Sequence, residues 1–190
     1  TWSAGERARV EEALSRRDDR QAFMRTLHEA IGRFAEPVHV LEEACRLLGT
    51  HLRVNGVAYG EIEGDDCTIV SDYVDGLSSQ AGRFRWTEMG ASRTEEILKG
   101  GTLSVNDTSI EPHTAAEREA MRAAGIGAYI CPLLVKDGRF VASFGVHSRE
   151  PRVWTTDEIA LVQDVADRIW VTLERRKAEA ELRANEGRLD

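Results

Sequence analysis

Apolar residues recur at three- and four-residue steps in three segments of the chain, which is the spacing that predicts amphipathic helices. The first segment follows Asp18-Asp19 and carries the stripe Phe23, Met24, Leu27, Ile31 and Phe34. The second follows the break at Glu36-Pro37 and carries Val38, Leu41, Ala44, Cys45, Leu48 and Leu52. The third begins at Thr156 and carries Ile159, Val162, Val165, Ala166, Ile169, Trp170 and Leu173. These stripes predict helices that pack on a sheet or on a partner chain.

Between the second and the third helical segment, β-rich runs bounded by turn residues predict strands. The predicted strands are Val54 to Ile62, Cys67 to Val74, a short run at Phe84-Arg85-Trp86, and Thr102 to Val105. Hydroxyl residues that stand three positions before a glutamate predict helix starts with reciprocal caps. These pairs are Ser92 with Glu95, Thr114 with Glu117, and Thr155 with Glu158.

The strongest local signal is a hairpin from Tyr129 to His147, built around Asp137-Gly138. A two-residue loop would place Cys131 opposite Phe144, whereas a three-residue loop with Gly138 as a bulge would place Cys131 on the face of Ser143. The alternation of side chains favours the bulged register. One face is then entirely apolar and packed: Ile130, Pro132, Leu134, Phe140, Ala142, Phe144 and Val146. The other face is mixed and is expected to border a cavity: Tyr129, Cys131, Leu133, Val141, Ser143, Gly145 and His147.

This order of elements predicts an α+β fold, with an antiparallel sheet of five or six strands. A helical layer is expected on one face of the sheet, and pocket-forming helices and loops on the other. A charged, helix-prone stretch precedes the apolar stripes, and residues 1–36 are expected to form N-terminal linker helices. Residues 37–173 form the predicted globular domain. Beyond Glu174 the chain is highly charged and only Ala178, Leu182 and Leu189 keep a heptad-like seam, so 174–190 is expected to be a coiled-coil helix.

Composition narrows the function. The net charge of −8 argues against a nucleic-acid partner, which would need a basic surface. No apolar run approaches the ~20 residues of a membrane span, and no signal peptide is seen, so we expect a cytoplasmic chain without a membrane partner. The histidines show no metal-ligand spacing. Cys45, Cys67 and Cys131 show no CxxC spacing, and they are expected to be buried and reduced.

Three stretches together resemble the GAF domain family, over roughly Pro37 to Leu173. They are GTLSVND at 101–107, RAAGIGAYICPLLVKDG at 122–138, and PRVWT at 151–155. The resemblance implies a PAS-like α+β sheet and a regulatory role in a bacterial signalling protein. The charged tail from Glu174 to Leu189 resembles the helix that joins such domains to a PAS domain or a histidine-kinase core. The resemblance therefore implies a sensor histidine kinase of a two-component system, of which this chain is expected to be one part.

The hairpin also resembles the chromophore-binding GAF domain of phytochromes, which place a histidine at the position of His147. Thr114 stands where plant-type phytochromes carry the cysteine that attaches a bilin, and Asn106-Asp107-Thr108 replaces their Asp-Ile-Pro signature. These departures argue against a covalent bilin, and a bilin-binding photosensor is kept as an alternative. The motif of cyclic-nucleotide-binding GAF domains is not found, so the cofactor is left open. A second alternative is a GAF enzyme that reduces free methionine sulfoxide with three cysteines, although the thiols here are poorly placed for it.

The sequence thus predicts a sensory module that binds a small ligand or relays a signal through dimeric helices, with no catalytic residue and no metal ligand. The predicted ligand-binding residues are Val57, Tyr59, Phe84, Trp86, Ile97, His113, Met121, Tyr129, Cys131, Ser143, Gly145 and His147. The predicted interface of a homodimer consists of Phe23, Leu27, Ile31, Phe34, Val162, Ile169, Leu173, Leu182 and Leu189. Neighbouring PAS or kinase domains in the same chain are the other expected partners.

Overall fold

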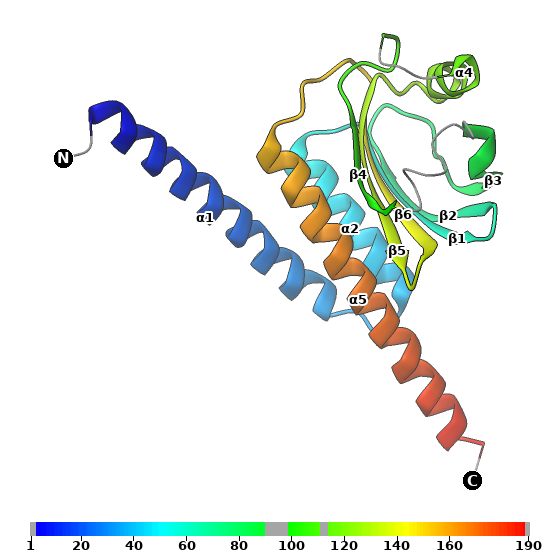
Figure 1. Ribbon diagram of the computed structural model, residues 1–190. Coiled ribbons are helices and arrows are strands. Elements are labelled where there is room, and N and C mark those ends of the chain that lie inside the picture. Colours follow the sequence, from blue (N-terminus) through cyan, green and yellow to red (C-terminus); the bar gives the residue numbers. More distant parts are fainter. Residues whose placement is uncertain (1–2, 90–98, 111–113, 189–190) are drawn as a thin grey trace.

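The computed structural model describes residues 3–89, 99–110 and 114–188, and it shows one antiparallel sheet between two unequal layers (Figure 1). In chain order the elements are α1 (Ala4–Gly32), α2 (Pro37–Leu52), β1 (Gly56–Glu63), β2 (Asp66–Val74), β3 (Gly82–Arg85), the 3-10 turn η1 (Trp86–Met89), β4 (Gly101–Val105), α4 (Ala115–Ala124), β5 (Ala128–Lys136), β6 (Arg139–Ser148) and α5 (Thr156–Glu186). Helices α1, α2 and α5 lie on one side of the sheet, and α4 lies toward the other (Figure 1). The predicted α+β fold is confirmed.

The sheet has six strands in the order β3-β2-β1-β6-β5-β4. The pair at its centre joins β1 to β6, which are far apart in the sequence. In this pair Val57 lies opposite Val146, and Tyr59 lies opposite Phe144. All four side chains are buried against the helical layer, so the central pair carries the core of the domain.

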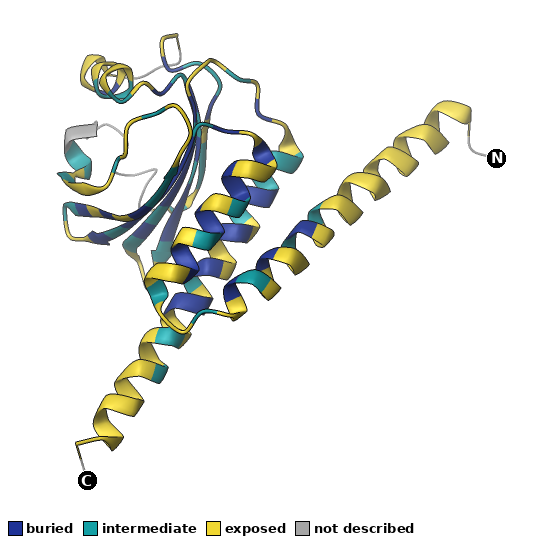
Figure 2. Ribbon diagram, turned by 180° about the vertical axis from the view of Figure 1, so that it is seen from behind, coloured by how far each residue is buried: buried dark blue, intermediate teal, exposed yellow. Residues whose placement is uncertain are grey.

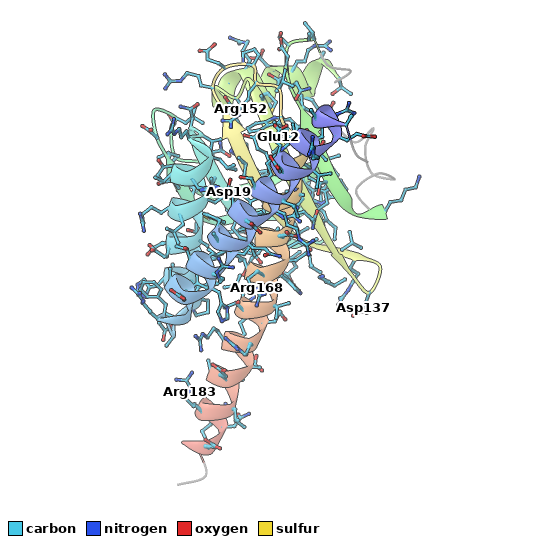
Figure 3. The ribbon with its side chains drawn as sticks, turned by 90° about the vertical axis from the view of Figure 1, so that its left-hand side faces the viewer. Glu12, Asp19, Asp137, Arg152, Arg168 and Arg183 are labelled. Carbon is cyan, nitrogen blue, oxygen red and sulfur yellow. The ribbon has the colours of Figure 1, made fainter. Side chains whose placement is uncertain are left out.

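The hairpin has the predicted faces but not the predicted loop. Asp137 and Gly138 both have positive φ, of 52° and 72°, and they form a two-residue turn that pairs Lys136 with Arg139. The bulge lies further along, where the register shifts between Leu134 and Val135, and it restores the alternation that the loop would have reversed. Figure 3 shows Asp137 at the tip of this hairpin.

The displaced bulge changes the faces of two residues. Phe140 pairs with Val135 and borders the cavity, whereas Val141 packs against the helical core. The prediction had these two residues the other way round, and it was wrong because it placed the extra residue in the turn. Beyond the bulge, Ser143 pairs with Leu133 and His147 with Tyr129, so the other cavity-facing positions are as predicted.

Helices α4 and α5 begin at the caps that their sequences predict. Thr114 and Thr155 cap α4 and α5, and in each case the threonine hydroxyl and a glutamate three residues later bond reciprocally to backbone amides. Ser92 lies outside the described residues. The indole Nε1 of Trp154 donates to the carbonyl of Val105 at 3.0 Å, which anchors the start of α5 to the end of β4.

Helices α1 and α5 run side by side in the same direction. Ion pairs join Arg16 to Asp157 and Arg20 to Asp164, and Arg176 donates to the carbonyl of Gly32 where α1 ends. The apolar stripe of α1 packs onto α2 and α5, and the stripe of α5 packs onto α2 and the sheet. The N-terminal half of α1 is exposed on all sides and projects from the domain, as does the C-terminal part of α5 (Figure 2). Arg183 lies on that projecting part (Figure 3).

This arrangement corrects the predicted dimer interface. Six of its residues are buried inside the single chain: Phe23, Leu27, Ile31, Val162, Ile169 and Leu173. Phe34 packs partly buried against the same core, and only Leu182 is largely exposed. Leu189 lies outside the described residues. The apolar stripes are wider than one sheet face can cover because the helices also pack against one another. No second chain is therefore needed to bury these residues.

We expect Ile169→Ala on α5 to destabilise the domain by about 2–5 kcal/mol, because it would leave a cavity in the core. Ile169 is fully buried, whereas Val171 on the same helix is 63% exposed. The matched control Val171→Ala should therefore change the free energy of unfolding by less than about 0.5 kcal/mol. Urea denaturation of both variants measures the difference. Equally small effects would mean that Ile169 is not part of an intramolecular core.

Candidate ligand site

A cavity of about 180 Å³ lies on the face of the sheet opposite the three long helices. The sheet contributes most of its floor: Ala58, Ile62, Cys67, Ile69, Leu103, Tyr129, Cys131, Leu133, Phe140, Ser143, Gly145 and His147. Its cover comes from the 75–81 loop, β3, η1, α4 and the turn after α4: Gln80, Phe84, Trp86, Glu117, Met121 and Ile126. Most of these side chains are apolar, with a few polar groups among them, which is how small-molecule sites are usually built.

Two glycines allow neighbouring side chains to pack closely on the cavity side of the sheet. A Cβ atom on Gly60 would lie 2.8 Å from the Cys67 Sγ and 3.0 Å from the Ser143 Oγ. A Cβ on Gly145 would lie 2.6 Å from the Nε2 of His147. Because such distances are too short for real atoms, any side chain at these positions would displace its neighbours. This packing therefore depends on residues that lack a side chain at the centre of the sheet.

One end of the cavity is polar and is organised around His147. Its Nδ1 lies 3.2 Å from the side-chain Nε2 of Gln80. The carboxylate of Asp72 accepts hydrogen bonds from the backbone N–H of Gln80, at 2.6 Å, and from the hydroxyl of Ser79, at 2.8 Å. Burial lowers the pKa of His147 to about 4, despite the opposing effect of the nearby Asp72 carboxylate. The imidazole is therefore neutral at physiological pH.

Aromatic side chains form the other end of the cavity. Trp86 and Phe140 meet edge to face, with ring centroids 5.9 Å apart. The indole Nε1 of Trp86 donates to the carbonyl of Gly64 at 2.9 Å, which fixes the orientation of the ring. Phe84, Trp86 and Phe140 pack against a small apolar cluster that includes Ile62 and Ile69. This end of the cavity offers contacts for an apolar or aromatic group.

All three cysteines carry free thiols. Cys67 and Cys131 border the cavity, whereas Cys45, a residue of α2, lies within the core on the helical side of the sheet. Burial raises the pKa of Cys67 to about 11, and those of Cys45 and Cys131 to about 12. Each sulfur is thus held as a thiol, which is a weak nucleophile.

The structure brings together most of the predicted site. Eight predicted residues line the cavity: Phe84, Trp86, Met121, Tyr129, Cys131, Ser143, Gly145 and His147. Ile97 and His113 lie outside the described residues. Whether the eight residues bind a ligand stays a prediction.

The placement of Val57 and Tyr59 was wrong. Both are buried on the helical side, because their partners Val146 and Phe144 in β6 belong to the core. Their neighbour Ala58, opposite Gly145, faces the cavity in their place. Comparing the alternation of β1 with that of β6 could have found this exchange, since bulky residues fill a core and small ones border a void.

Two polar lining residues, Gln80 and Glu117, were not predicted from the sequence. Gln80 comes from an irregular loop, where no periodicity tells which way a side chain points. Glu117 was recognised only as a capping residue, and it fills that role while also bordering the cavity.

Within the described ranges, no group of three or more His, Cys, Asp or Glu side chains could hold a metal ion. In the same part of the chain, no helix combines the length and the apolar character needed to cross a bilayer.

Comparisons with known proteins agree with this fold. The family model of the GAF domain matches residues 36–173. No curated protein sequence matches the chain. One similar solved structure is the phycoerythrobilin-bound GAF domain of a cyanobacterial phytochrome, with a TM-score of 0.74, 15% identity, and coverage of 85% of this chain and 97% of that one.

Two further similar structures come from named bacteria. The chromophore-binding domain of a bacteriophytochrome from R. palustris has a TM-score of 0.74 and 12% identity, and the match covers 85% of this chain and 63% of that longer one. The blue-light-absorbing form of the PixJ GAF domain from Thermosynechococcus elongatus has a TM-score of 0.66 and 19% identity, with coverage of 90% and 95%. At these identities the likeness shows the fold.

The lowered pKa of His147 predicts how stability depends on pH. As the pH falls from about 6.5 to about 4, the unfolded chain takes up a proton at His147 that the folded domain does not. This group should therefore reduce the free energy of unfolding across that window, with no further loss once the folded form is also protonated. His147→Gln removes this titration, and its urea midpoint should fall less than that of the wild type between pH 7 and pH 4. Parallel pH profiles would contradict the assignment.

Proposed function

Because the chain belongs to the GAF domain family, we propose that it is a regulatory sensory module that binds a small molecule in the cavity and passes the event to α5. The observation that carries the proposal is the cavity itself. It is bordered by Gly145 and Ser143 at the centre of the sheet, and it has one polar and one aromatic end.

The size of the cavity supports a ligand of about one ring. An engineered apolar cavity of about 150 Å³ is known to hold a benzene molecule. The cavity here measures about 180 Å³, which suits a single ring with a small polar substituent. Sites for drug-sized ligands are larger, at roughly 300–1,000 Å³.

The size of the cavity favours a ligand smaller than a bilin. Three of the similar structures are described as carrying bilins, namely phycoerythrobilin, biliverdin and phycocyanobilin. A bilin is a chain of four pyrrole rings with two carboxylate side chains, and it greatly exceeds a one-ring cavity. The carboxyl group of Glu117 on the wall also opposes an anionic ligand. The proposal therefore includes no chromophore.

A short path leads from the cavity floor to α5. Glu61 follows Gly60 in β1, and its carboxylate pairs with the Lys177 ammonium at 3.2 Å. Lys177 stands next to Arg176, which bonds to the end of α1. A shift of β1 upon ligand binding would thus reach the point where α5 leaves the body of the domain. This connection supports a relay, as expected of a module that precedes an output domain in a cytoplasmic histidine kinase.

We assign no catalytic step to the isolated domain. The three-cysteine alternative requires an accessible thiolate with a resolving thiol beside it. The raised pKa values of Cys67 and Cys131 oppose such a thiolate. Cys45 lies in the core on the other side of the sheet, away from both.

Binding of a one-ring probe tests the proposal. Titration with acetophenone, followed by ¹H–¹⁵N correlation spectra, should shift the amide signals of Cys131, Ser143 and Gly145. Gly145→Phe fills the cavity and should abolish these shifts. Gly145→Ala is a second variant, for use if the larger side chain unfolds the protein, and it should weaken the shifts. The control Gly32→Ala adds a Cβ in open space and should bind as the wild type does. No shifts in the wild type, or equal binding by Gly145→Phe, would overturn the proposal.

A second part of the proposal is that two copies associate through the projecting helical segments. The first turns of α1 and the last turns of α5 are polar nearly all round, and such helices are marginal alone in water. The apolar side chains left exposed on α1 and α5 are Val10, Leu14, Val171 and Leu182. Of these, Val10, Leu14 and Leu182 lie on the projecting segments and replace the buried residues as the interface that we propose.

Sedimentation of the wild type should therefore show a dimer, and the double variant Leu14→Lys with Leu182→Lys should sediment as a monomer with an unchanged urea midpoint. The control Val153→Lys changes a more exposed apolar residue outside these helices and should leave the dimer intact. A wild-type protein that stays monomeric at high concentration would rule out this interface.

A further inference from the structure

We propose that Gln80 is a positioning residue that fixes His147 in the tautomer with its proton on Nε2. The polar end of the cavity then presents a hydrogen-bond donor, and it selects a neutral ligand that carries an acceptor, such as a carbonyl oxygen or a pyridine-type nitrogen. The inference rests on the proposed function in one respect only, namely that a ligand occupies the cavity. The state of His147 itself does not depend on a ligand.

The loop that carries Gln80 is held firmly against the sheet. The Asp72 carboxylate accepts from the backbone N–H of Gln80 at 2.6 Å and from the Ser79 hydroxyl at 2.8 Å. The same Ser79 oxygen accepts from the N–H of Ala81 at 3.2 Å. Further back in the loop, Leu77 lies against the positions of Gly56 and Gly125. The backbone of Gln80 is thus fixed at β2, and its side chain reaches across to β6.

The contact between Gln80 and His147 determines the tautomer. A neutral imidazole has one protonated and one unprotonated nitrogen. The Gln80 amide nitrogen lies 3.2 Å from Nδ1 of His147, and an amide nitrogen can only donate. With the amide in this orientation Nδ1 is the acceptor, and the proton is on Nε2.

The Nε2 edge of the ring lies over Gly145, which borders the cavity. Nε2 is the atom nearest to the place of a Cβ on Gly145, and both residues line the cavity. A donor at this point pairs with a lone pair on the ligand. The carboxyl group of Glu117 on the same wall opposes a negatively charged acceptor, which leaves neutral ones.

The reversed amide would have the opposite consequence. With the Gln80 carbonyl oxygen toward the ring, Nδ1 would carry the proton, and Nε2 would offer a lone pair to a ligand that donates. The two arrangements therefore predict ligands of opposite hydrogen-bonding character, and the tautomer distinguishes them before any ligand is known.

Long-range ¹H–¹⁵N NMR of the full chain at pH 7, with His147→Gln to assign the signals, measures the tautomer directly. We expect Nδ1 of His147 in the unprotonated range and Nε2 in the protonated range. Gln80→Leu removes the donor, so a share of the Nδ1-protonated form should appear and move the two ¹⁵N shifts toward each other. The matched control Gln21→Leu, on the exposed surface of α1, should leave both shifts unchanged. A protonated Nδ1 in the wild type, or unchanged shifts in Gln80→Leu, would overturn the proposal.

A matched pair of probes tests the ligand class. Acetophenone and α-methylstyrene have nearly the same shape, but only the ketone offers an acceptor. The wild type should bind the ketone about two- to tenfold more tightly, since a net hydrogen bond contributes about 0.5–1.5 kcal/mol. Gln80→Leu should lower this ratio, and equal affinities in the wild type would refute the donor. If neither probe binds, the proposed function is wrong. A protonated Nδ1 in the NMR experiment would contradict only this inference and would not bear on whether the cavity binds a ligand.

Discussion

The structure depends on the pairing of β1 with β6 at the centre of the sheet. Their alternation sends bulky side chains to one face and small ones to the other. Val57, Tyr59, Phe144 and Val146 pack under the helices, while Ala58, Gly60, Ser143 and Gly145 face the opposite side. A strand pair can place its two sets of side chains in only this way, because the period of a strand is two residues. One pairing thus creates the core and leaves room for the cavity.

Part of this arrangement could be predicted from the sequence. The hairpin showed an apolar face and a mixed face, and the structure has both, because alternation constrains a strand more strongly than the length of its turn. The loop itself was mispredicted: Asp137 and Gly138 form the two-residue turn, and a bulge near Val141 compensates for it. A bulge can insert one extra residue into a strand without a recognisable sequence pattern. The exchange of Phe140 and Val141 between the two faces could therefore not be predicted.

Other errors have a common physical cause, which is that a periodic pattern shows a buried face but not what buries it. The stripe of α1 with Leu27 and Ile31 resembles a seam between two chains, yet it is covered within one chain. In β1 both faces are apolar enough to be buried, so the pattern of β1 alone could not place Tyr59 without a comparison with β6. Gln80 lies in a loop without periodicity, and only the three-dimensional structure brings it to His147.

The central claim is that the face of the sheet opposite the long helices carries a cavity in which a small ligand can be held. Crystals of the wild type placed under xenon pressure test this claim without knowledge of the natural ligand, because xenon enters apolar cavities of this size. The account predicts xenon density between Gly145 and the Trp86–Phe140 pair, and its loss in Gly145→Phe. Absence of xenon from this site in the wild type, with side chains filling the space, would contradict the account.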